Sequence, residues 1–430
     1  MPLAQAQLPE VVTPVPGPRS CQLASRLGRV ESRNVTCLAP TPPIFWERAS
    51  GTNVWDVDGN RFVDLSAAFG VATTGHGHPR VVAALHKQAD SLVHGMGDVH
   101  PSRTKVEVLE ALARLYPGAE AVRTVLGSSG SDAVESALKT ALLATGRPGV
   151  VAFEGAYHGL SLGALDATWR HDFRDPFQAR LPQRTVFARF GDVEDVSRVA
   201  AESGSPIGAV LVEPVQGRGG ERVPPAGFLA ALRGLCDREG WLLIADEIYT
   251  GFGRTGRTWA CDHEAVIPDL LCAGKGLASG MPLSACMGRA ALMDDAWPES
   301  RGEALHTQTF LGHPLGCAAA LASIAVFEDE NLAARAAATG AAALDRLGSK
   351  LSGAAGISDV RGKGLMIGVE FESAQQAQGA VTRCLGRGVI LLPAGDDGRV
   401  ISLTPPLNID ADLLLHALDV LIDAILEATA

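Results

Sequence analysis

Four short runs of almost uninterrupted apolar residues constrain the fold of this chain more than any other feature. The runs are Val150–Phe153, Ala209–Val212, Trp241–Ala245 and Leu270–Ala273. Strands that are apolar on both faces are typical of a parallel sheet covered by helices on each side. Apolar residues at helical spacing in segments 133–145 and 228–239 supply such helices. The sequence therefore predicts an α/β domain built on a mainly parallel sheet.

The two ends of the chain show a different pattern, in which short strands are separated by turns. The N-terminal strands are expected at 44–46, 53–56 and 61–65, and Asp58-Gly59 is typical of a hairpin turn. The C-terminal strands are expected at 364–371, 389–392 and 400–403, after a long alanine-rich helix that begins near Ala319 and before a final helix. We expect both ends to form one smaller α+β domain.

Domain boundaries follow from these changes of pattern. Residues 1–30 are expected to be a flexible tail, because residues 1–20 hold five prolines and show no periodicity. Residues 31–100 are assigned to the N-terminal part of the small domain and residues 101–320 to the large domain. Residues 321–430 are assigned to the C-terminal part of the small domain.

Charge and hydropathy argue against several classes of partner. The formal net charge of −11 disfavours nucleic acid, which binds basic surfaces. No run of about 18 apolar residues without charges is present, so no membrane partner is expected. The eight cysteines contain no C-x-x-C pair, so neither a disulfide framework nor a metal site is expected. Without a secretory signal pattern, we expect a cytoplasmic protein.

Four features with chemical potential lie at or just after the apolar runs and the predicted strand 122–126. They are the turn Gly127–Ser131, the aromatic Tyr157, the acid Asp246, and Lys275 between two glycines. Ligands of an open parallel sheet bind outside the carboxyl ends of its strands, which is where these residues would meet. Lysine is rare here, at six of the 37 basic positions, so Lys275 is notable.

Each feature alone also has an ordinary structural explanation. The turn Gly127–Ser131 could be a capped helix start, Asp246 a helix cap and Tyr157 part of a packed loop. Lys363, which also lies beside a glycine, competes with Lys275. Together, however, the four features match the needs of pyridoxal 5'-phosphate (PLP), which are an anion site, a ring cover, a carboxylate for the pyridine nitrogen and a Schiff-base lysine.

At this point the chain, over roughly residues 40–425, resembles the class III (ω-) aminotransferases of PLP fold type I. The resemblance rests on seven motifs, at residues 129–139, 156–159, 212–217, 244–256, 274–276, 309–316 and 404–407. It implies a large PLP-binding domain with a sheet of the seven-stranded type, a smaller α+β domain, and a homodimer with shared active sites. It also implies small-molecule amine and carbonyl substrates.

The resemblance implies a role for each matching residue around the cofactor. Lys275 would form the Schiff base and carry protons, and Asp246 would pair with the pyridine nitrogen. Ile248 would pack behind the ring and Tyr157 in front of it.

The phosphate is expected to be held by two residues of one subunit and one of the other. Gly130 and Ser131 would hold it from within the chain. Thr309 would reach it from the partner subunit, which makes the homodimer necessary for a complete site.

The sequence departs from the family pattern at three positions. Ser402 stands where many members have an arginine that binds an α-carboxylate, so Glu213 lacks its usual partner and could face a substrate amine or pair with Arg218. Tyr249 stands where many members have glutamine, and His313 where asparagine is usual.

Three aromatic residues of the N-terminal segments are candidates for a substrate-facing wall. They are Phe45, Trp46 and Phe69, and core packing is the alternative explanation for each ring.

The expected function is a PLP-dependent aminotransferase that transfers an amino group from an amine or amino compound to a carbonyl acceptor without the arginine clamp. The main alternative is a racemase, epimerase or aminomutase on the same fold, since some members of those classes also lack the arginine. A non-catalytic protein on this fold is a weaker alternative, because a regulator needs neither Lys275 nor Asp246.

Overall fold

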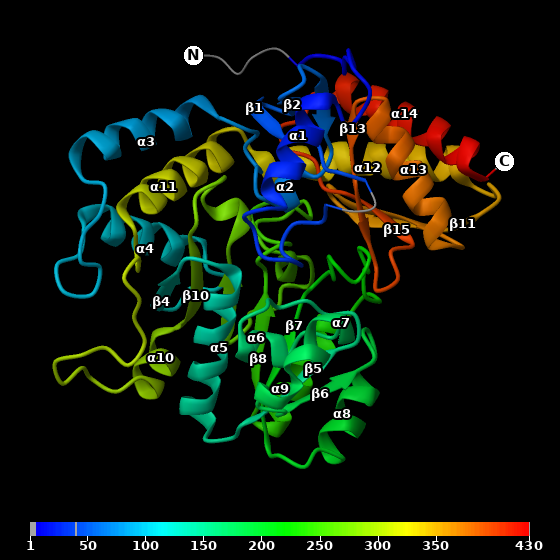
Figure 1. Cartoon of the computed structure of the whole chain (residues 1–430). Coiled ribbons are helices and arrows are strands. Elements are labelled where there is room, and N and C mark those ends of the chain that lie inside the picture. The colour runs from blue at the N-terminus through cyan, green and yellow to red at the C-terminus, as the bar shows by residue number, and fades with distance from the viewer. Residues whose placement is uncertain (1–5, 39–40, 430) are drawn as a thin grey trace.

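The computed structural model describes residues 6–38 and 41–429, and its large domain is built on one seven-stranded sheet (Figure 1). The strand order is β4-β10-β9-β8-β7-β5-β6. The strands are β4 Val122–Gly127, β5 Gly149–Phe153, β6 Thr185–Ala188, β7 Ile207–Val212, β8 Leu242–Asp246, β9 Leu270–Ala273 and β10 Ser284–Arg289. Strands β5 to β9 pair in parallel, and β10 pairs antiparallel with both β4 and β9. The predicted α/β fold with a mainly parallel sheet is therefore confirmed.

Two strands of this sheet have no counterpart in the prediction. Strand β6 has four residues and lies at the sheet edge, where its side chains are only partly buried. Strand β10 reads Ser-Ala-Cys-Met-Gly-Arg and contains no β-branched or aromatic residue. β propensity therefore gives little signal for β10, whereas β6 reads Thr-Val-Phe-Ala and is missed because it is only four residues long.

Helices cover both faces of the large sheet, as expected for central strands such as β7 and β9 in which every residue is buried. On one face, α5 (Gly130–Thr145), α6 (Leu162–Asp166) and α10 (Ala290–Ala296) pack against residues such as Leu211. On the other face lie α4 (Arg103–Leu115), α8 (Val193–Ala201), α9 (Phe228–Glu239) and α11 (Pro314–Asp329), which pack against neighbours such as Val210 and Val212. Adjacent residues of a strand point to opposite faces, so both cores draw on the same strand.

The small domain combines the two ends of the chain (Figure 1). Its first sheet has the order β1-β2-β3-β13, with β1 Trp46–Ser50, β2 Asn53–Asp56, β3 Arg61–Asp64 and β13 Val389–Ile390. Its second sheet has the order β11-β12-β15-β14, with β11 Ile357–Lys363, β12 Met366–Phe371, β15 Val400–Leu403 and β14 Leu392–Ala394. Val389 pairs in parallel with Val63, which joins the two ends of the chain in one sheet.

Helices α12 (Leu332–Leu351), α13 (Ala374–Gly386) and α14 (Ala411–Thr429) cover the small domain. The predicted single helix from Ala319 is in fact two helices, α11 and α12, and α11 already begins at Pro314. The chain turns at Asn331, whose φ of 50° belongs to the left-handed region that asparagine tolerates. Within the described residues, no helix is both long and apolar enough to span a membrane.

The remaining helical elements are short connections, apart from α1 and α3. They are α1 Pro18–Leu27, α2 Ala67–Gly70, α3 Pro79–Ser91, α7 His171–Arg174, and the 3-10 segments η1 Asp175–Arg180, η2 Ala260–Glu264 and η3 Lys275–Leu277.

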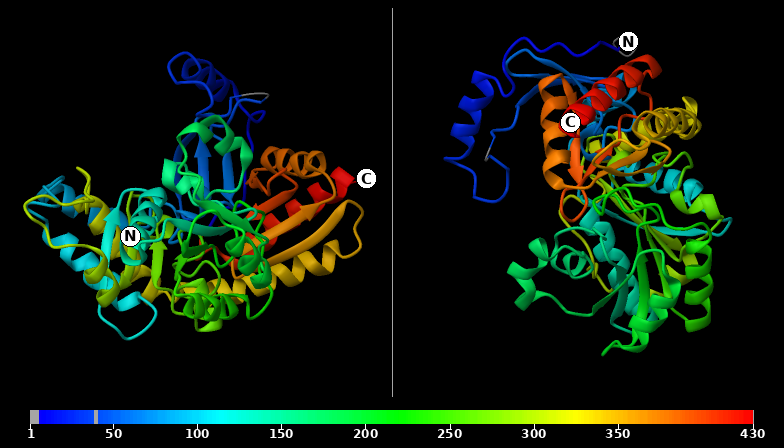
Figure 2. Two further views of the ribbon diagram at one scale, coloured as in Figure 1. Left: turned by 90° about the horizontal axis from the view of Figure 1, so that it is seen from below. Right: turned by 90° about the vertical axis from the view of Figure 1, so that its right-hand side faces the viewer.

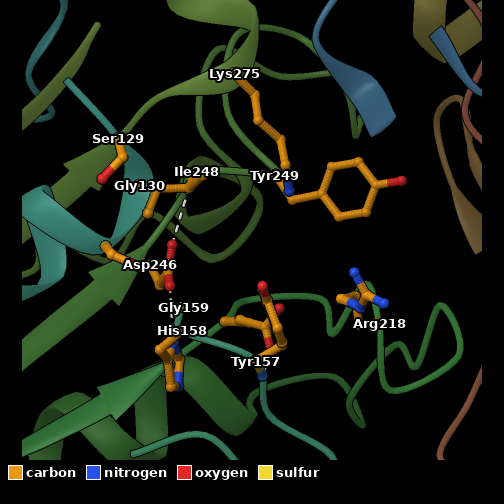
Figure 3. Close-up of a pocket in the computed structure, with 12 residues that line it drawn as sticks. Ser129, Gly130, Tyr157, His158, Gly159, Arg218, Asp246, Ile248, Tyr249 and Lys275 are labelled. Atoms are coloured by element: carbon orange, nitrogen blue, oxygen red, sulfur yellow. Dashed lines mark hydrogen bonds and ion pairs between the residues drawn. The ribbon is translucent and has the colours of Figure 1, made fainter. Parts of the chain in front are cut away.

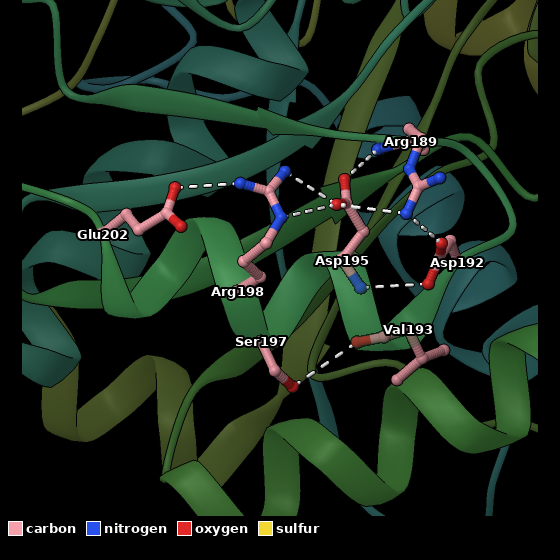
Figure 4. A network of polar contacts seen from close by, with 7 residues as sticks. All are labelled: Arg189, Asp192, Val193, Asp195, Ser197, Arg198 and Glu202. Atoms are coloured by element: carbon pink, nitrogen blue, oxygen red, sulfur yellow. Dashed lines mark hydrogen bonds and ion pairs between the residues drawn. The ribbon is translucent and has the colours of Figure 1, made fainter.

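A network of charged residues holds α8 against the edge of the large sheet (Figure 4). Asp195 accepts hydrogen bonds from the Arg189 backbone N–H at 2.8 Å and from Arg198 Nε at 2.9 Å. Asp192 caps α8 by accepting from the Asp195 N–H at 3.0 Å. The network supplies hydrogen-bond acceptors at the start of α8 and therefore has a structural role in fixing this helix.

Helix α1 lies in the segment that the sequence predicts to be a flexible tail, and it projects from the small domain (Figure 2). Its own N-cap, Gly17, has no side chain to accept the first N–H groups. Asp58 of the β2–β3 turn caps the helix instead, because its carboxylate accepts from the Arg19 N–H at 2.7 Å and from the Ser20 N–H at 2.9 Å. A cap from a distant segment gives no local sequence signal, which explains the difference from the predicted tail.

We expect Asp58→Ala to release α1 without unfolding the rest of the protein. Loss of a helix cap costs about 1–2 kcal/mol, so the amides of residues 18–27 should exchange with solvent about 5–30-fold faster. Hydrogen exchange followed by mass spectrometry measures this, with Asp90→Ala, an exposed carboxylate on α3, as the control. Unchanged exchange in residues 18–27 would show that Asp58 does not hold the helix.

Candidate functional site

A cavity opens at the carboxyl ends of the parallel strands, as expected for an open α/β sheet (Figure 3). It is lined by Ser129, Gly130, Ser131, Tyr157, His158, Gly159, Glu213, Arg218, Asp246, Ile248, Tyr249 and Lys275. We call it the cofactor cavity. Six of the residues that the sequence predicts to bind a cofactor line this cavity, and the seventh, Thr309, does not.

Lys275 reaches into the cofactor cavity from the turn after β9 and lies across it from Tyr157 (Figure 3). Its Nζ lies 3.6 Å from the centroid of the Tyr249 ring. The side chain is accessible from the cavity, but the surrounding protein withholds most of the water from its amine. This desolvation lowers the pKa of Lys275 to about 8, although Asp246 and Glu213 oppose the shift. About half of the amine is therefore neutral near pH 8, and a neutral amine is a nucleophile.

Asp246 at the end of β8 is held from two sides (Figure 3). Its Oδ2 lies 2.7 Å from His158 Nδ1, and its Oδ1 accepts from the Ile248 N–H at 3.1 Å. Because the carboxylate accepts, Nδ1 of His158 carries the proton. Both side chains are buried, so the pair fixes the position of the carboxylate.

His158 is a site residue to which the sequence analysis assigns no role. The motif Ala156–Gly159 contains it, but a histidine next to a tyrosine does not indicate which strand end it faces. Its partner Asp246 is 88 residues away, so only the fold reveals the contact. Among the described residues, its Nε2 is buried without a partner.

The N-terminus of α5 forms a cradle suited to an anion. Ser129 is the N-cap, and its Oγ accepts from the Asp132 N–H at 3.2 Å. Ser129 and Asp132 form a capping box, in which the side chain of each accepts from the backbone N–H of the other. The N–H groups of Gly130 and Ser131 have no acceptor within the helix and face the cavity side.

Glycine at position 159 allows the loop after β5 to close over this cradle. Its φ is 122°, and a Cβ there would lie 2.0 Å from Ser131 Oγ. Ser131 Oγ accepts from the Leu160 N–H at 3.1 Å, which ties the loop to α5. Tyr157, on the same loop, is thereby brought to the cavity wall.

Ile248 packs beside the start of α5. A Cβ at Gly130 would lie 3.1 Å from Ile248 Cδ1, so the isoleucine fills the space next to the cradle. On the Tyr157 side, the Arg218 guanidinium lies 4.9 Å from the centroid of the tyrosine ring. Tyr157 and Ile248 thus offer an aromatic and an aliphatic surface to the cavity.

A second cavity adjoins the first and shares Tyr157, Arg218, Tyr249 and Lys275 with it. Its further lining residues are Phe69, Arg170, Gly217, Glu221, Leu392, Pro393, Ala394 and Ser402. We call it the substrate cavity. Of the three aromatic candidates, only Phe69 lines it, whereas Trp46 packs its ring edge on His76 at 5.6 Å and Phe45 lies outside both cavities.

Glu213 lies at the end of β7 and is held by backbone groups. It accepts from the Tyr157 N–H at 3.1 Å and from the Gly217 N–H at 3.4 Å. Burial raises its pKa to about 7, and the nearby charge of Asp246 adds to the shift. Within the described residues it forms no ion pair with Arg218, so the pairing considered from the sequence is not present.

The other departures from the family pattern fall in different places. The Tyr249 hydroxyl lies 3.1 Å from Thr404 Oγ1, and its ring borders both cavities. The His313 ring stacks on His94 at 5.6 Å, outside both cavities. Lys363, the competing lysine, lies at the end of β11 and lines a separate cavity with His263 and Glu264.

A buried amine, a fixed carboxylate and an anion cradle at the ends of parallel strands define a site for a Schiff-base enzyme with a phosphorylated cofactor. Comparison with known proteins agrees. Residues 37–425 match the family "Aminotransferase class-III". The chain belongs to this PLP-dependent family of aminotransferases.

Named relatives differ in the substrates that their names indicate. A 4-aminobutyrate aminotransferase of Mycobacterium leprae is 37% identical over 96% of this chain and 97% of its own. The structure of an ornithine aminotransferase from Toxoplasma gondii has a TM-score of 0.86 at 31% identity, covering 94% of each chain. An amine transaminase from an uncultivated Pseudomonas species has a TM-score of 0.84 at 29% identity, covering 93% of this chain and 98% of its own.

The residues of the cofactor cavity fit PLP. The α5 start offers unpaired N–H groups to a phosphate, and Asp246 offers a fixed carboxylate to a protonated ring nitrogen. The flat space beside Tyr157 and Ile248 suits an aromatic ring, and Lys275 supplies an amine. Among residues 6–38 and 41–429, no group of three potential ligands could hold a metal ion.

We expect PLP to attach to Lys275 and to no other lysine. Borohydride reduction of the enzyme with PLP, followed by peptide mapping, should place the label on Lys275. The rate of attachment should rise with pH and level off above a midpoint of about 8, because the protonated amine does not react. A matched variant, Lys363→Arg, should label normally. A label on Lys363, or a midpoint near the ordinary lysine value of 10.5, would contradict the assignment.

Proposed function

We propose that this protein moves an amino group from an amine to a carbonyl compound and that residue 402 does not bind a substrate α-carboxylate. Membership of the class-III family supports the transfer. The observation that carries the second part is the environment of Ser402. Its hydroxyl donates to Glu221 in the substrate cavity, so an acid stands where a carboxylate-binding cation would be needed.

The cofactor residues have distinct roles in this proposal. When bound, PLP supplies a ring that withdraws electrons from the substrate Cα. Asp246, held by His158 at 2.7 Å, keeps a proton on the ring nitrogen. In this arrangement the Lys275 amine would take a proton from the substrate Cα and would return a proton to the cofactor. A positioned amine of this kind accelerates proton transfer by about 10²–10⁴-fold.

The remaining cofactor residues bind and orient. The N–H groups of Gly130 and Ser131 donate to the phosphate at the positive end of α5. Tyr157 covers one face of the ring and Ile248 the other. These residues would hold the cofactor next to Lys275, which borders both cavities.

A half-reaction without acceptor tests this function. The holoenzyme is mixed in deuterated water with butylamine or with glutamate, and pyridoxamine phosphate is measured by chromatography. We expect pyridoxamine phosphate from butylamine at least about 10-fold faster than from glutamate, because a charge-assisted contact to the α-carboxylate is missing.

Two other results would contradict the proposal in different ways. Equal or faster reaction with glutamate would show that another group binds the α-carboxylate. Incubation with chiral amines and amino acids provides the second comparison. Deuterium at Cα with inversion and without pyridoxamine phosphate would identify a racemase or epimerase, and a shifted amino group would identify an aminomutase.

We further propose a homodimer with shared active sites. Thr309 is exposed and lies outside both cavities of its own chain, so its predicted phosphate contact requires a partner subunit. Large apolar side chains are exposed on its own loop and on the loop after α3, and they include Val93, Met96, Val99, Leu305 and Phe310. Such a group of exposed apolar residues is typical of an interface.

Complementation between two inactive variants tests the shared site. Lys275→Ala removes the amine of one site, and Thr309→Ala weakens phosphate binding in the other subunit's site. A hybrid dimer of the two variants contains one intact site. Co-expression should therefore restore activity well above the sum of the separate variants, and a simple sum would contradict the shared site.

A further inference from the structure

Glu221 is a buried carboxyl group in the substrate cavity that the cofactor chemistry does not use. Its exposed fraction is 0%, and its side chain lines the cavity together with Lys275 and Ser402. One carboxyl oxygen, Oε1, accepts from the Ser402 hydroxyl. The other, Oε2, is buried without a hydrogen-bond partner among the described residues. A buried, half-satisfied carboxyl group is costly unless something binds to it.

The fold holds this carboxyl group in place with some strain. Glu221 has a φ of 52°, in the left-handed region that a non-glycine residue adopts at a cost. It lies within a turn that is closed by paired backbone hydrogen bonds of 3.0 Å between Gln216 and Arg222. Opposite it, Gly368 of β12 leaves room, since a Cβ there would lie 2.9 Å from Glu221 Cβ. The turn between Gln216 and Arg222 and the neighbouring strand β12 together hold Glu221 in this conformation.

Among the described residues, Glu221 forms no ion pair, although Arg170, Arg218 and Lys275 line the same cavity. Burial raises the pKa of its carboxyl group to about 8, while Ser402 and the more distant Lys275 and Arg254 act in the opposite direction. Arg254 Nη1 donates to the carbonyls of Leu365 and Pro405, whereas its Nε and Nη2 are buried without a partner among the described residues. Lys275 is engaged by the cofactor in the proposed function. Among the described residues nothing donates to Glu221 Oε2, so this atom is available to a ligand cation in the substrate cavity.

We infer that Glu221 and Ser402 form a subsite for the second ammonium group of a diamine substrate. The reacting amine would lie at Lys275, and the distal ammonium would donate to Glu221 Oε2, which has no other donor. Ser402 keeps the carboxyl group oriented through Oε1. The inference rests on the proposed amino-transfer function and specifies its substrate class.

Paired amines of equal length test the subsite in the half-reaction of the holoenzyme. Cadaverine is compared with pentylamine, and putrescine with butylamine, by the apparent second-order rate of pyridoxamine phosphate formation. A hydrogen bond to a charged group contributes about 1.5–3 kcal/mol, so the better-fitting diamine should react about 10–150-fold faster than its monoamine.

A charge-neutral variant separates an ion pair from a neutral hydrogen bond. Glu221→Gln keeps the shape of the side chain and one acceptor oxygen, but it replaces the other oxygen with an amide donor and removes the charge. We expect the ratio of diamine to monoamine rates to fall to about one in this variant. The matched control Glu372→Gln, an exposed carboxylate just after β12, should keep the wild-type ratio.

The outcomes distinguish the subsite from the underlying function. If both amines of each pair react at equal rates in the wild-type enzyme, the subsite is wrong and amino transfer stands. If Glu221→Gln retains the preference, a charge at residue 221 is not what recognises the diamine. If neither amine yields pyridoxamine phosphate, the proposed function fails and the subsite with it. The wild-type ratio decides the question even if the variant does not fold.

Discussion

The desolvation of one amine is the constraint on which the rest of this site depends. Lys275 has to be reactive near neutral pH, and burial lowers its pKa to about 8 by removing water from the ammonium group. Asp246, Glu213 and Glu221 keep that shift moderate, and all three lie near the same edge of the sheet. A parallel sheet makes this possible, because it brings the ends of distant segments together. The helical layers on both faces then supply the dry surroundings.

Much of the fold could be predicted from the sequence, because the strongest signals are local. Apolar runs located β5, β7, β8 and β9, and the residues after these runs located Lys275 and Asp246. The contacts that could not be predicted join distant segments. Asp58 caps α1 from 38 residues away, and Ser402 meets Glu221 across 181 residues. Neither contact leaves a spacing or a propensity that a single sequence displays.

The two adjoining cavities place the proposed cofactor residues and the proposed substrate residues on different parts of the fold. The cofactor cavity is built from the ends of the large sheet and the start of α5. The substrate cavity adds residues of the small domain, among them Ser402 on β15 and Pro393 on β14. In the proposed function, changes at residues 221 and 402 would alter the charge that a substrate meets and would leave the cradle at Gly130 intact. The relatives named above differ in the substrates that their names indicate, which agrees with separate residues for cofactor and substrate.

A crystal structure of the protein purified with PLP tests the arrangement most directly. The central claim is that Lys275 and Asp246 face one cofactor from opposite ends of its ring. Continuous electron density should therefore join Lys275 Nζ to the cofactor, with the pyridine nitrogen at Asp246 and the phosphate at the N-terminus of α5. Cofactor density attached to Lys363, or a ring nitrogen turned away from Asp246, would contradict that claim.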